Sequence, residues 1–256
     1  MLALCSTAAS PGASTLALLL AAASPQPAVV VEADPDGGCL GARLDLPDEP
    51  GLVTLAAAAR RGVHSQLVEE HTQSLTSTSS VVIGPAAAHA VTSVLSTSAE
   101  VIGAALQSTT STRVVLDCGR LSPESAAWPL ATISDLIVIV TRPRLDEARR
   151  LPSRVTELRT AGAPLGLVVV GERPYSPTEV ADVADVELLG VIADDARTAA
   201  LVTGTPGHDG VLRRSGLWRS VVALAESLDR RLVGAERVAV PPTDEPFELN
   251  AGNGRR

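Results

Sequence analysis

The amino-acid sequence predicts an α/β protein with a doubly wound, mostly parallel sheet of about seven strands and helices on both faces. Three observations predict this class. Short apolar, β-branched runs alternate with helical stretches along the chain. Only 2% of the residues are aromatic while 45% are hydrophobic, so the core must consist of small aliphatic side chains, which suit parallel strands covered by helices. At 256 residues, the chain can also bury a substantial core within one domain.

Seven apolar runs are expected to form the strands, because each is short and apolar on both faces. They span residues 2–6, 28–33, 80–83, 113–117, 135–140, 165–170 and 187–192. The stretches between them are expected to be helical, because they are longer and separate one apolar run from the next. These helices cover roughly residues 14–23, 51–60, 86–106, 144–160, 177–185 and 195–203.

The last helix has the clearest periodicity. Leu217, Val221, Leu224 and Leu228 recur at steps of three and four residues, with charged residues on the other side. We expect this apolar face to dock on the sheet, although a partner or membrane helix remains an alternative. A single domain should therefore cover residues 1–234. The Pro-, Gly- and charge-rich residues 235–256 are expected to be disordered.

The charge of the chain limits its partners. There are 29 acidic and 21 basic residues, which gives a net charge of −8, and every basic residue is an arginine. A dedicated nucleic-acid binder would show a basic face, so nucleic-acid binding has only the cluster of Arg213, Arg214 and Arg219 in its favour. The three cysteines are far apart and fit neither a disulfide framework nor a zinc pattern.

The apolar run LALLLAAASP near the N-terminus is interpreted as a helix of the fold. No arginine occurs among the first 42 residues, so the positive flank of a signal peptide is absent. The run is also too short to cross a membrane, and a predicted buried strand follows it directly. We therefore expect a cytoplasmic protein, and a peripheral association with a membrane stays open.

The turn after the first strand is the candidate ligand site. In an open parallel sheet, ligands bind beyond the carboxyl ends of the strands, and the segment STAASPGASTLAL places a turn and a helix start there. The unpaired N–H groups of Gly12, Ala13, Ser14 and Thr15 are expected to face an anion. The hydroxyl of Ser14 is what magnesium would need. A turn that only caps the helix is the alternative.

The segments that follow the turn favour a nucleotide site. VVVEADPDGG and RVVLDCGR each end an apolar strand with an acid, and LGLVVVGERPYSPTEV and LLGVIADDARTAALVTG come later. In this order the chain resembles the MinD/ParA family of P-loop ATPases over roughly residues 2–232. It looks like a group from high-GC bacteria whose loop carries Ser-Pro-Gly. The resemblance implies a P-loop fold with ATP and Mg²⁺ as ligands.

The resemblance also implies roles for single residues. Ser14 would ligate magnesium, and Thr15 would support the phosphates. Asp34 would be catalytic by orienting the attacking water, and Asp117 would reach magnesium through water. The other residues expected to contact the nucleotide are Ser10, Pro11, Gly12, Ala13, Arg173 and Asp195.

Several of these residues also have a purely structural interpretation. Asp34 lies in DPDGG, which makes a good turn without any chemistry. Asp117 at a strand end is also a typical cap or turn residue. Asp195 in ADDARTAA is a typical helix N-cap, and Arg173 in GERPY is a turn residue unless its guanidinium stacks on a base.

The loop departs from the family pattern where the family carries its positive charge. Ala13 stands in the place of the P-loop lysine, and Ala8 in the place of the signature lysine. Gly171 replaces the base-recognising Asn, and Glu32 replaces the first acid of the Asp-x-Asp pair. One lost charge-assisted hydrogen bond costs about 1.5–3 kcal/mol of binding, and one lost preorganised donor costs about 10²–10³ in rate. We therefore expect weak nucleotide binding and nearly abolished hydrolysis.

Three functions stay open. The first is a MinD/ParA-like module with a weak or inactive ATPase, which binds a protein partner or a second copy of itself in chromosome partitioning, pilus assembly or secretion. The second is an active ATPase whose cation comes from a partner or from Arg43, Arg120 or Arg142. The third and most distant is a dinucleotide-binding protein, because Glu32 lies 20 residues after Gly12.

Overall fold

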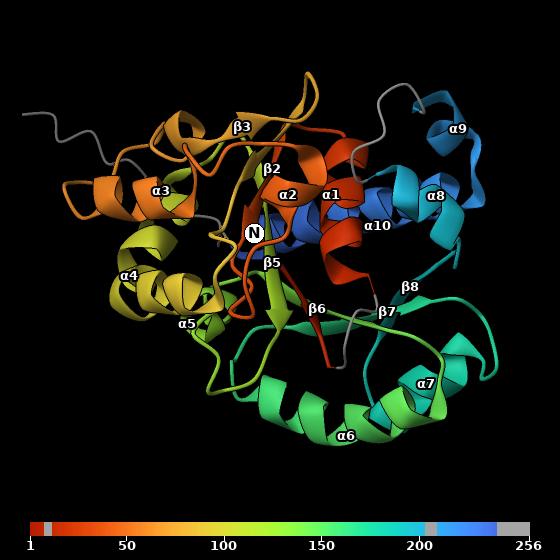
Figure 1. The fold of residues 1–256 in the computed structure, drawn as a ribbon. Coiled ribbons are helices and arrows are strands. Elements are labelled where there is room, and N and C mark those ends of the chain that lie inside the picture. The colour runs from red at the N-terminus through yellow and green to blue at the C-terminus, as the bar shows by residue number, and fades with distance from the viewer. Residues whose placement is uncertain (8–11, 203–208, 240–256) are drawn as a thin grey trace, which may run out of the picture.

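The structure, a computed structural model, describes residues 1–7, 12–202 and 209–239, with side chains described over 210–232 in the last segment. A single eight-stranded sheet runs through the molecule (Figure 1) in the order β3-β4-β2-β5-β1-β6-β7-β8. The strands are β1 (Leu2–Ser6), β2 (Ala28–Glu32), β3 (Gln73–Ser74), β4 (Ser79–Val82), β5 (Arg113–Arg120), β6 (Leu136–Thr141), β7 (Leu165–Val170) and β8 (Leu188–Ile192). Only the pairing of β3 with β4 is antiparallel. The predicted fold class is confirmed.

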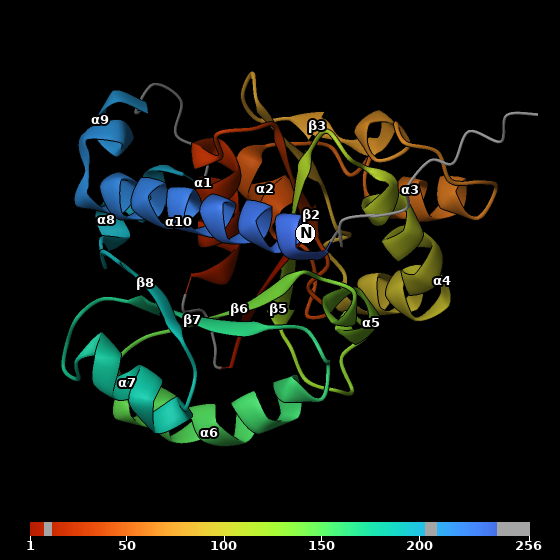
Figure 2. The ribbon, with the colours of Figure 1, turned by 180° about the vertical axis from the view of Figure 1, so that it is seen from behind.

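The helices cover both faces of this sheet (Figures 1 and 2). They are α1 (Ala13–Ala23), α2 (Leu40–Leu44), α3 (Leu52–Ala59), α4 (Ala88–Ser108), α5 (Trp128–Thr132), α6 (Leu145–Arg159), α7 (Pro177–Ala184), α8 (Ala196–Leu201), α9 (Asp209–Arg214) and α10 (Gly216–Ala239), with a short 3-10 turn at Glu69–His71. Helices α3 to α7 pack on one face, and α1, α2 and α10 pack on the other.

Two aliphatic cores lie on either side of the sheet. Because successive strand residues point to opposite faces, β1 places Ala3 and Cys5 in one core and Leu2 and Leu4 in the other. Small β-branched residues from the neighbouring strands fill both layers, as the near absence of aromatic residues requires. This packing holds the carboxyl ends of the central strands in fixed positions.

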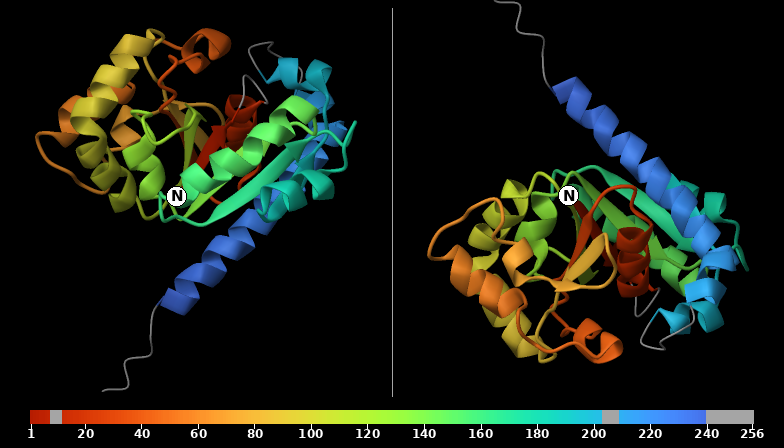
Figure 3. Two further views of the ribbon diagram at one scale, coloured as in Figure 1. Left: turned by 90° about the horizontal axis from the view of Figure 1, so that it is seen from below. Right: turned by 90° about the horizontal axis from the view of Figure 1, so that it is seen from above.

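Helix α10 docks its apolar face as predicted. Leu217, Val221, Leu224 and Leu228 are buried in the core on the α1 side of the sheet. The helix continues to Ala239, into the segment 235–256 that was expected to be disordered, and Figure 3 shows its end extending beyond the sheet. Residues 240–256 lie outside the described part of the chain.

The structure corrects the sequence expectations at several places. Strand β5 continues to Arg120, so Asp117 lies within the strand and not at its end. Strand β3 and the helices α2, α5 and α9 were not expected, because each is six residues or shorter and lacks a periodic apolar pattern. Across the described residues, we find no helix whose length and apolar character would let it span a membrane.

Candidate functional site

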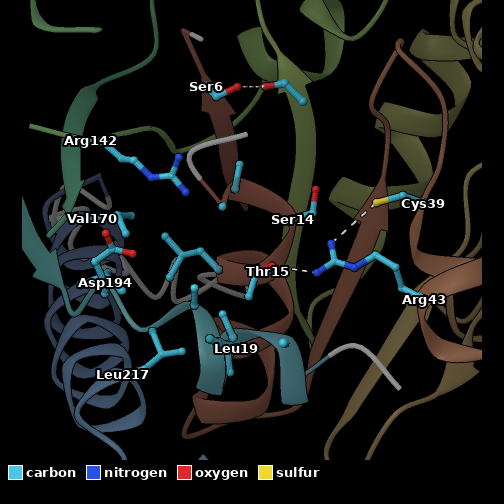
Figure 4. A pocket seen from close by; sticks show the side chains of 18 of the residues that line it. Ser6, Ser14, Thr15, Leu19, Cys39, Arg43, Arg142, Val170, Asp194 and Leu217 are labelled. Atoms are coloured by element: carbon cyan, nitrogen blue, oxygen red, sulfur yellow. Dashed lines mark hydrogen bonds between the residues drawn. The ribbon is translucent and has the colours of Figure 1, made fainter. Parts of the chain in front are cut away.

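A cavity of about 600 Å³ opens beside the start of α1, at the carboxyl ends of the central strands. Figure 4 shows the side chains that line it. Several residues predicted to bind the nucleotide contribute to this lining: Gly12, Ala13, Ser14, Thr15, Asp34 and Asp195. Arg173 is exposed and does not line the cavity. Ala8, Ser10 and Pro11 lie outside the described residues.

The first turn of α1 faces the cavity with its backbone. Gly12 precedes the helix at φ 100°, in the left-handed region that favours glycine, and no side chain of the described residues caps the helix at this end. The N–H groups of Ala13, Ser14 and Thr15 therefore have no acceptor within the helix. Since all three residues line the cavity, the geometry fits an anion at the positive end of the helix dipole.

Asp34 reaches this cavity from the loop after β2. Its Oδ1 accepts a hydrogen bond of 2.9 Å from the N–H of Asp36, and its carboxyl group packs directly on Gly119. Burial raises the pKa of Asp34, an effect that the Asp36 N–H and Arg120 oppose. The turn contact that sequence analysis offered as the alternative is thus present, and it also fixes the carboxyl group at the cavity wall.

The contact between Asp34 and Gly119 leads to a stability prediction. Gly119 has φ 55°, and a Cβ there would lie 2.0 Å from Cγ of Asp34. We expect Gly119→Ala to lower the melting temperature by more than roughly 2–8 °C, because left-handed backbone alone costs about 1–2 kcal/mol for alanine and the clash with Asp34 adds to that cost. It should also displace Asp34. Gly162→Ala is the matched control, since φ is 79° there and no atom lies within 4 Å of the new Cβ.

Differential scanning calorimetry of the two variants separates backbone strain from the clash. Gly162→Ala should show the backbone cost alone, and Gly119→Ala should lose more stability and also lose nucleotide binding. Equal losses of stability in the two variants would show that the position of the Asp34 carboxyl group does not depend on close packing against Gly119.

Asp117 is fully buried in β5, next to β1 and β2. Burial raises its pKa to about 6, and the repulsion of Asp34 and Glu32 adds to this, while hydrogen bonding by Ser14 and the Gly119 N–H opposes it. The Gly119 N–H donates to Oδ1 at 3.3 Å, but Oδ2 has no partner among the described residues. An acid that is buried and half satisfied in this way is suited to receive a cation or a bound water.

Glu32 has a structural role instead. It is buried in β2 and accepts hydrogen bonds from the backbone N–H groups of Cys39, Leu40 and Gly84, at 2.5, 2.8 and 3.0 Å. These bonds tie the loop after β2 to the end of β4. The carboxylate is therefore engaged by the protein and is not free to read a ribose hydroxyl.

Asp195 is engaged in a similar way. Its side chain caps α8, accepting hydrogen bonds from the Thr198 N–H at 3.0 Å and from the Thr198 hydroxyl at 2.5 Å. These bonds lower its pKa. The helix-cap interpretation from the sequence describes this residue well, and the neighbouring Asp194 supplies a second carboxyl group to the cavity lining.

Three arginines, which sequence analysis named as replacements for the missing lysines, all line the cavity: Arg43, Arg120 and Arg142. Arg120 forms an exposed ion pair with Asp36 at 2.7 Å. Arg43 donates a hydrogen bond of 2.9 Å to the Thr15 hydroxyl. Arg142 extends into the cavity from the end of β6, so that it and Arg43 approach the start of α1 from opposite sides (Figure 4).

Unpaired polar atoms also occur in three neighbouring strands or directly after them, and of the three residues concerned Arg142 lines the cavity while Thr7 and Asp117 do not. Within the described residues, the buried side-chain atoms without a hydrogen-bond partner are Oγ1 of Thr7, Oδ2 of Asp117 and Nε of Arg142. These residues follow or belong to β1, β5 and β6, which are neighbours in the sheet. Buried polar groups are nearly always paired, so unpaired atoms in three neighbouring strands near their carboxyl ends are consistent with a polar ligand site. Sequence analysis missed Thr7, which no motif distinguishes.

The donor set also fits a hydrated magnesium ion. No three His, Cys, Asp or Glu side chains of the described residues come together as a metal site. Mg²⁺ is usually held by one or two carboxylates together with waters and substrate phosphates. Ser14 and the unpaired oxygen of Asp117 match that pattern, and the ion would supply charge neutralisation to a bound phosphate chain.

Solved structures with this fold are known from several organisms. A ParA family ATPase from Chlorobium tepidum TLS superposes with a TM-score of 0.75 at 17% identity, over 89% of this chain and 97% of that one. The septum site-determining protein MinD complexed with Mg-ADP from Pyrococcus horikoshii OT3 gives 0.68 at 18% identity, over 92% and 99%. MinD in the MinC:MinD cell division protein complex of Aquifex aeolicus gives 0.66 at 13%, over 91% and 95%.

The sequence itself matches no protein-family model and no curated protein. At these levels of identity, the structural similarity shows the fold and its extent. The chain has the fold of the ParA and MinD ATPases over about nine-tenths of its length.

Proposed function

We propose that this chain is a MinD/ParA-like protein that binds a magnesium nucleotide weakly, hydrolyses it slowly or not at all, and acts by binding a protein partner. The observation that supports this best is the set of unpaired buried atoms from Thr7, Asp117 and Arg142, of which Arg142 lines the cavity at the start of α1, where no side chain of the described residues caps the helix. A phosphate chain would provide acceptors for the Arg142 guanidinium, and the cation that accompanies it would provide a partner for the Asp117 carboxylate.

The lack of lysine supports weak binding and slow turnover. Four carboxyl groups line the cavity, from Asp34, Asp36, Asp194 and Asp195, and they outnumber its three arginines. One of those arginines is already paired with Asp36. A phosphate chain would therefore meet net repulsion from the protein, and its binding should depend strongly on the cation that accompanies it.

A protein partner fits this assignment better than nucleic acid does. The P. horikoshii MinD was solved with Mg-ADP and the A. aeolicus MinD with MinC, and we propose a comparable nucleotide and protein partner, or a second copy of the chain, for this protein. The candidate basic patch is partly engaged, because Arg213 stacks over Trp218 at 5.1 Å and Arg219 donates to the carbonyl of Arg214. Chromosome partitioning, pilus assembly and secretion are the processes that we propose.

An active ATPase that uses one of its own arginines is the second candidate, which the positions of Arg43 and Arg142 favour. A dinucleotide-binding protein finds no support in the cavity, because Glu32 is occupied by three backbone N–H groups.

Titration with a fluorescent ATP analogue, combined with an assay of phosphate release, tests this proposal. We expect micromolar or weaker affinity that depends on Mg²⁺, and turnover that Asp34→Ala leaves unchanged because it is at background. Appreciable turnover that Asp34→Ala abolishes would favour the active ATPase. If ATP, ADP and GTP all fail to bind at millimolar concentration, the proposed function is wrong.

A further inference from the structure

We propose that Arg142 is the phosphate-binding cation of this cavity, and that it takes over a contact that the start of α1 no longer provides. This inference rests on the proposed function and assigns a specific residue to it. Arg142 follows β6, at the side of the cavity opposite Arg43 (Figure 4).

The guanidinium of Arg142 has no partner of its own. No hydrogen bond or ion pair joins it to any described residue, and its Nε atom is buried. An unpaired buried donor is energetically unfavourable. The cavity lining contains four carboxyl groups, but no carboxylate of the described residues forms an ion pair with this guanidinium.

The backbone that carries Arg142 is fixed firmly. Glu147 is buried and its Oε2 accepts hydrogen bonds from the Arg142 N–H at 2.8 Å and the Thr141 hydroxyl at 3.0 Å. Pro143 follows and restricts the next φ angle. The carboxylate binds the backbone and not the guanidinium, so it orients Arg142 without neutralising it. The fixed backbone keeps the unpaired guanidinium in the cavity lining, where an anion can bind it.

The other two arginines of the cavity are less suited to this contact. Arg120 is exposed and paired with Asp36, and Arg43 is bonded to the Thr15 hydroxyl and contacts the sulfur of Cys39 at 3.8 Å. Binding a phosphate through either of them would break a bond that already exists. Arg142 can bind without such a loss, and its planar group can hold two phosphate oxygens at once.

The test compares nucleotides that differ only in phosphate number. Calorimetric titration of AMP, ADP and ATP with Mg²⁺ gives the gain in affinity per phosphate for the wild type and for Arg142→Gln, which keeps much of the side-chain stem. We expect ADP and ATP to bind about 10–100-fold more weakly to the variant. The affinity for AMP should change by no more than about threefold.

Two further variants act as controls. Arg142→Lys keeps the charge and should recover part of the lost affinity. Arg144→Ala removes an exposed arginine two residues away and should leave all three affinities unchanged. Ligand-free Arg142→Gln should also unfold at the same temperature as the wild type or higher, because the guanidinium, whose Nε atom is buried without a partner, has been removed. If Arg142 only supported the fold, its replacement would instead lower the unfolding temperature.

The outcomes separate this inference from the proposed function. If the wild type binds ADP and ATP, and Arg142→Gln binds them equally well, the assignment of Arg142 is wrong while the nucleotide site stands. If Arg142→Gln weakens AMP as much as ATP, the residue does not contact the phosphates. If the wild type binds none of the three nucleotides, the proposed function fails and this inference fails with it.

Discussion

Replacing Asp117 with asparagine will stabilise the ligand-free protein at pH 8. Burial raises the pKa of this carboxyl group from 3.8 to about 6. A difference of about two units, at about 1.4 kcal/mol per unit, corresponds to roughly 3 kcal/mol. A raised pKa in the folded state favours the protonated acid, so this contribution is fully present below about pH 4 and is lost as the pH rises through about 6. The variant has no such group to lose.

Denaturation by urea at pH 5 and pH 8 measures this effect. We expect Asp117→Asn to be about 1–3 kcal/mol more stable than the wild type at pH 8, and more stable by about half that amount at pH 5, because the contribution is lost between about pH 4 and pH 6. Glu32 and Asp34 also have raised pKa values, so some pH dependence of the stability will remain in Asp117→Asn. The variant Asp34→Asn measures how much of that pH dependence comes from Asp34. A less stable Asp117→Asn at pH 8 would mean that the carboxylate already has a favourable partner.

Ligand binding should respond to the same variant in the opposite direction. Asp117→Asn removes the negative charge that would hold Mg²⁺, so the dependence of nucleotide affinity on Mg²⁺ should largely disappear. Lowering the pH from 7 to 5 should weaken binding by the wild type for the same reason. A residue that improves stability when removed, yet weakens binding, is typical of a functional site.

Introducing a lysine at position 13 will tighten nucleotide binding. Ala13 is nearly buried, begins α1 and lines the cavity. A lysine there would place its ammonium group at the anion site, and one charge-assisted hydrogen bond is worth about 1.5–3 kcal/mol. We expect Ala13→Lys to bind ADP about 10–100-fold more tightly than the wild type, measured by calorimetric titration.

Ala13→Met is the matched control, because its side chain is long and uncharged. It should bind ADP no better than the wild type. The double variant Ala13→Lys with Arg142→Gln adds a second check, since two cations that serve one phosphate should have non-additive effects. If Ala13→Lys and Ala13→Met bind ADP equally, phosphate does not lie against the start of α1.

Much of the fold follows from patterns that the sequence displays directly. Runs such as LIVIV in β6 are apolar on both faces, and only a buried parallel strand suits them. The pairing of β3 with β4 could not be seen, because Gln73 and Ser74 lie in a Ser- and Thr-rich segment with no apolar alternation. The extension of β5 past Asp117 was hidden for another reason, since Gly119 in the motif LDCGR indicates a turn.

The sequence could suggest a candidate site only where the site depends on position along a strand or helix, and the cavity lining includes Asp34 but not Asp117. The carboxyl ends of parallel strands share one edge, so the loop, Asp34 and Asp117 were expected together. The roles of the other residues at the candidate site depend on their hydrogen bonds, which the sequence does not show. Nothing in the sequence shows that Glu32 binds three backbone N–H groups, or that the guanidinium of Arg142 lacks a partner among the described residues while that of Arg120 has one.

The thermal unfolding of the protein with ADP, in the presence and absence of Mg²⁺, tests the nucleotide site most directly. At a ligand concentration ten times the dissociation constant, binding stabilises the folded state by about 1.4 kcal/mol, which raises the melting temperature by roughly 3–6 °C. We predict a shift of this size with Mg-ADP at millimolar concentration, and a smaller one without the ion. An unchanged melting temperature with Mg-ADP and Mg-ATP at that concentration would contradict the assignment of a nucleotide site.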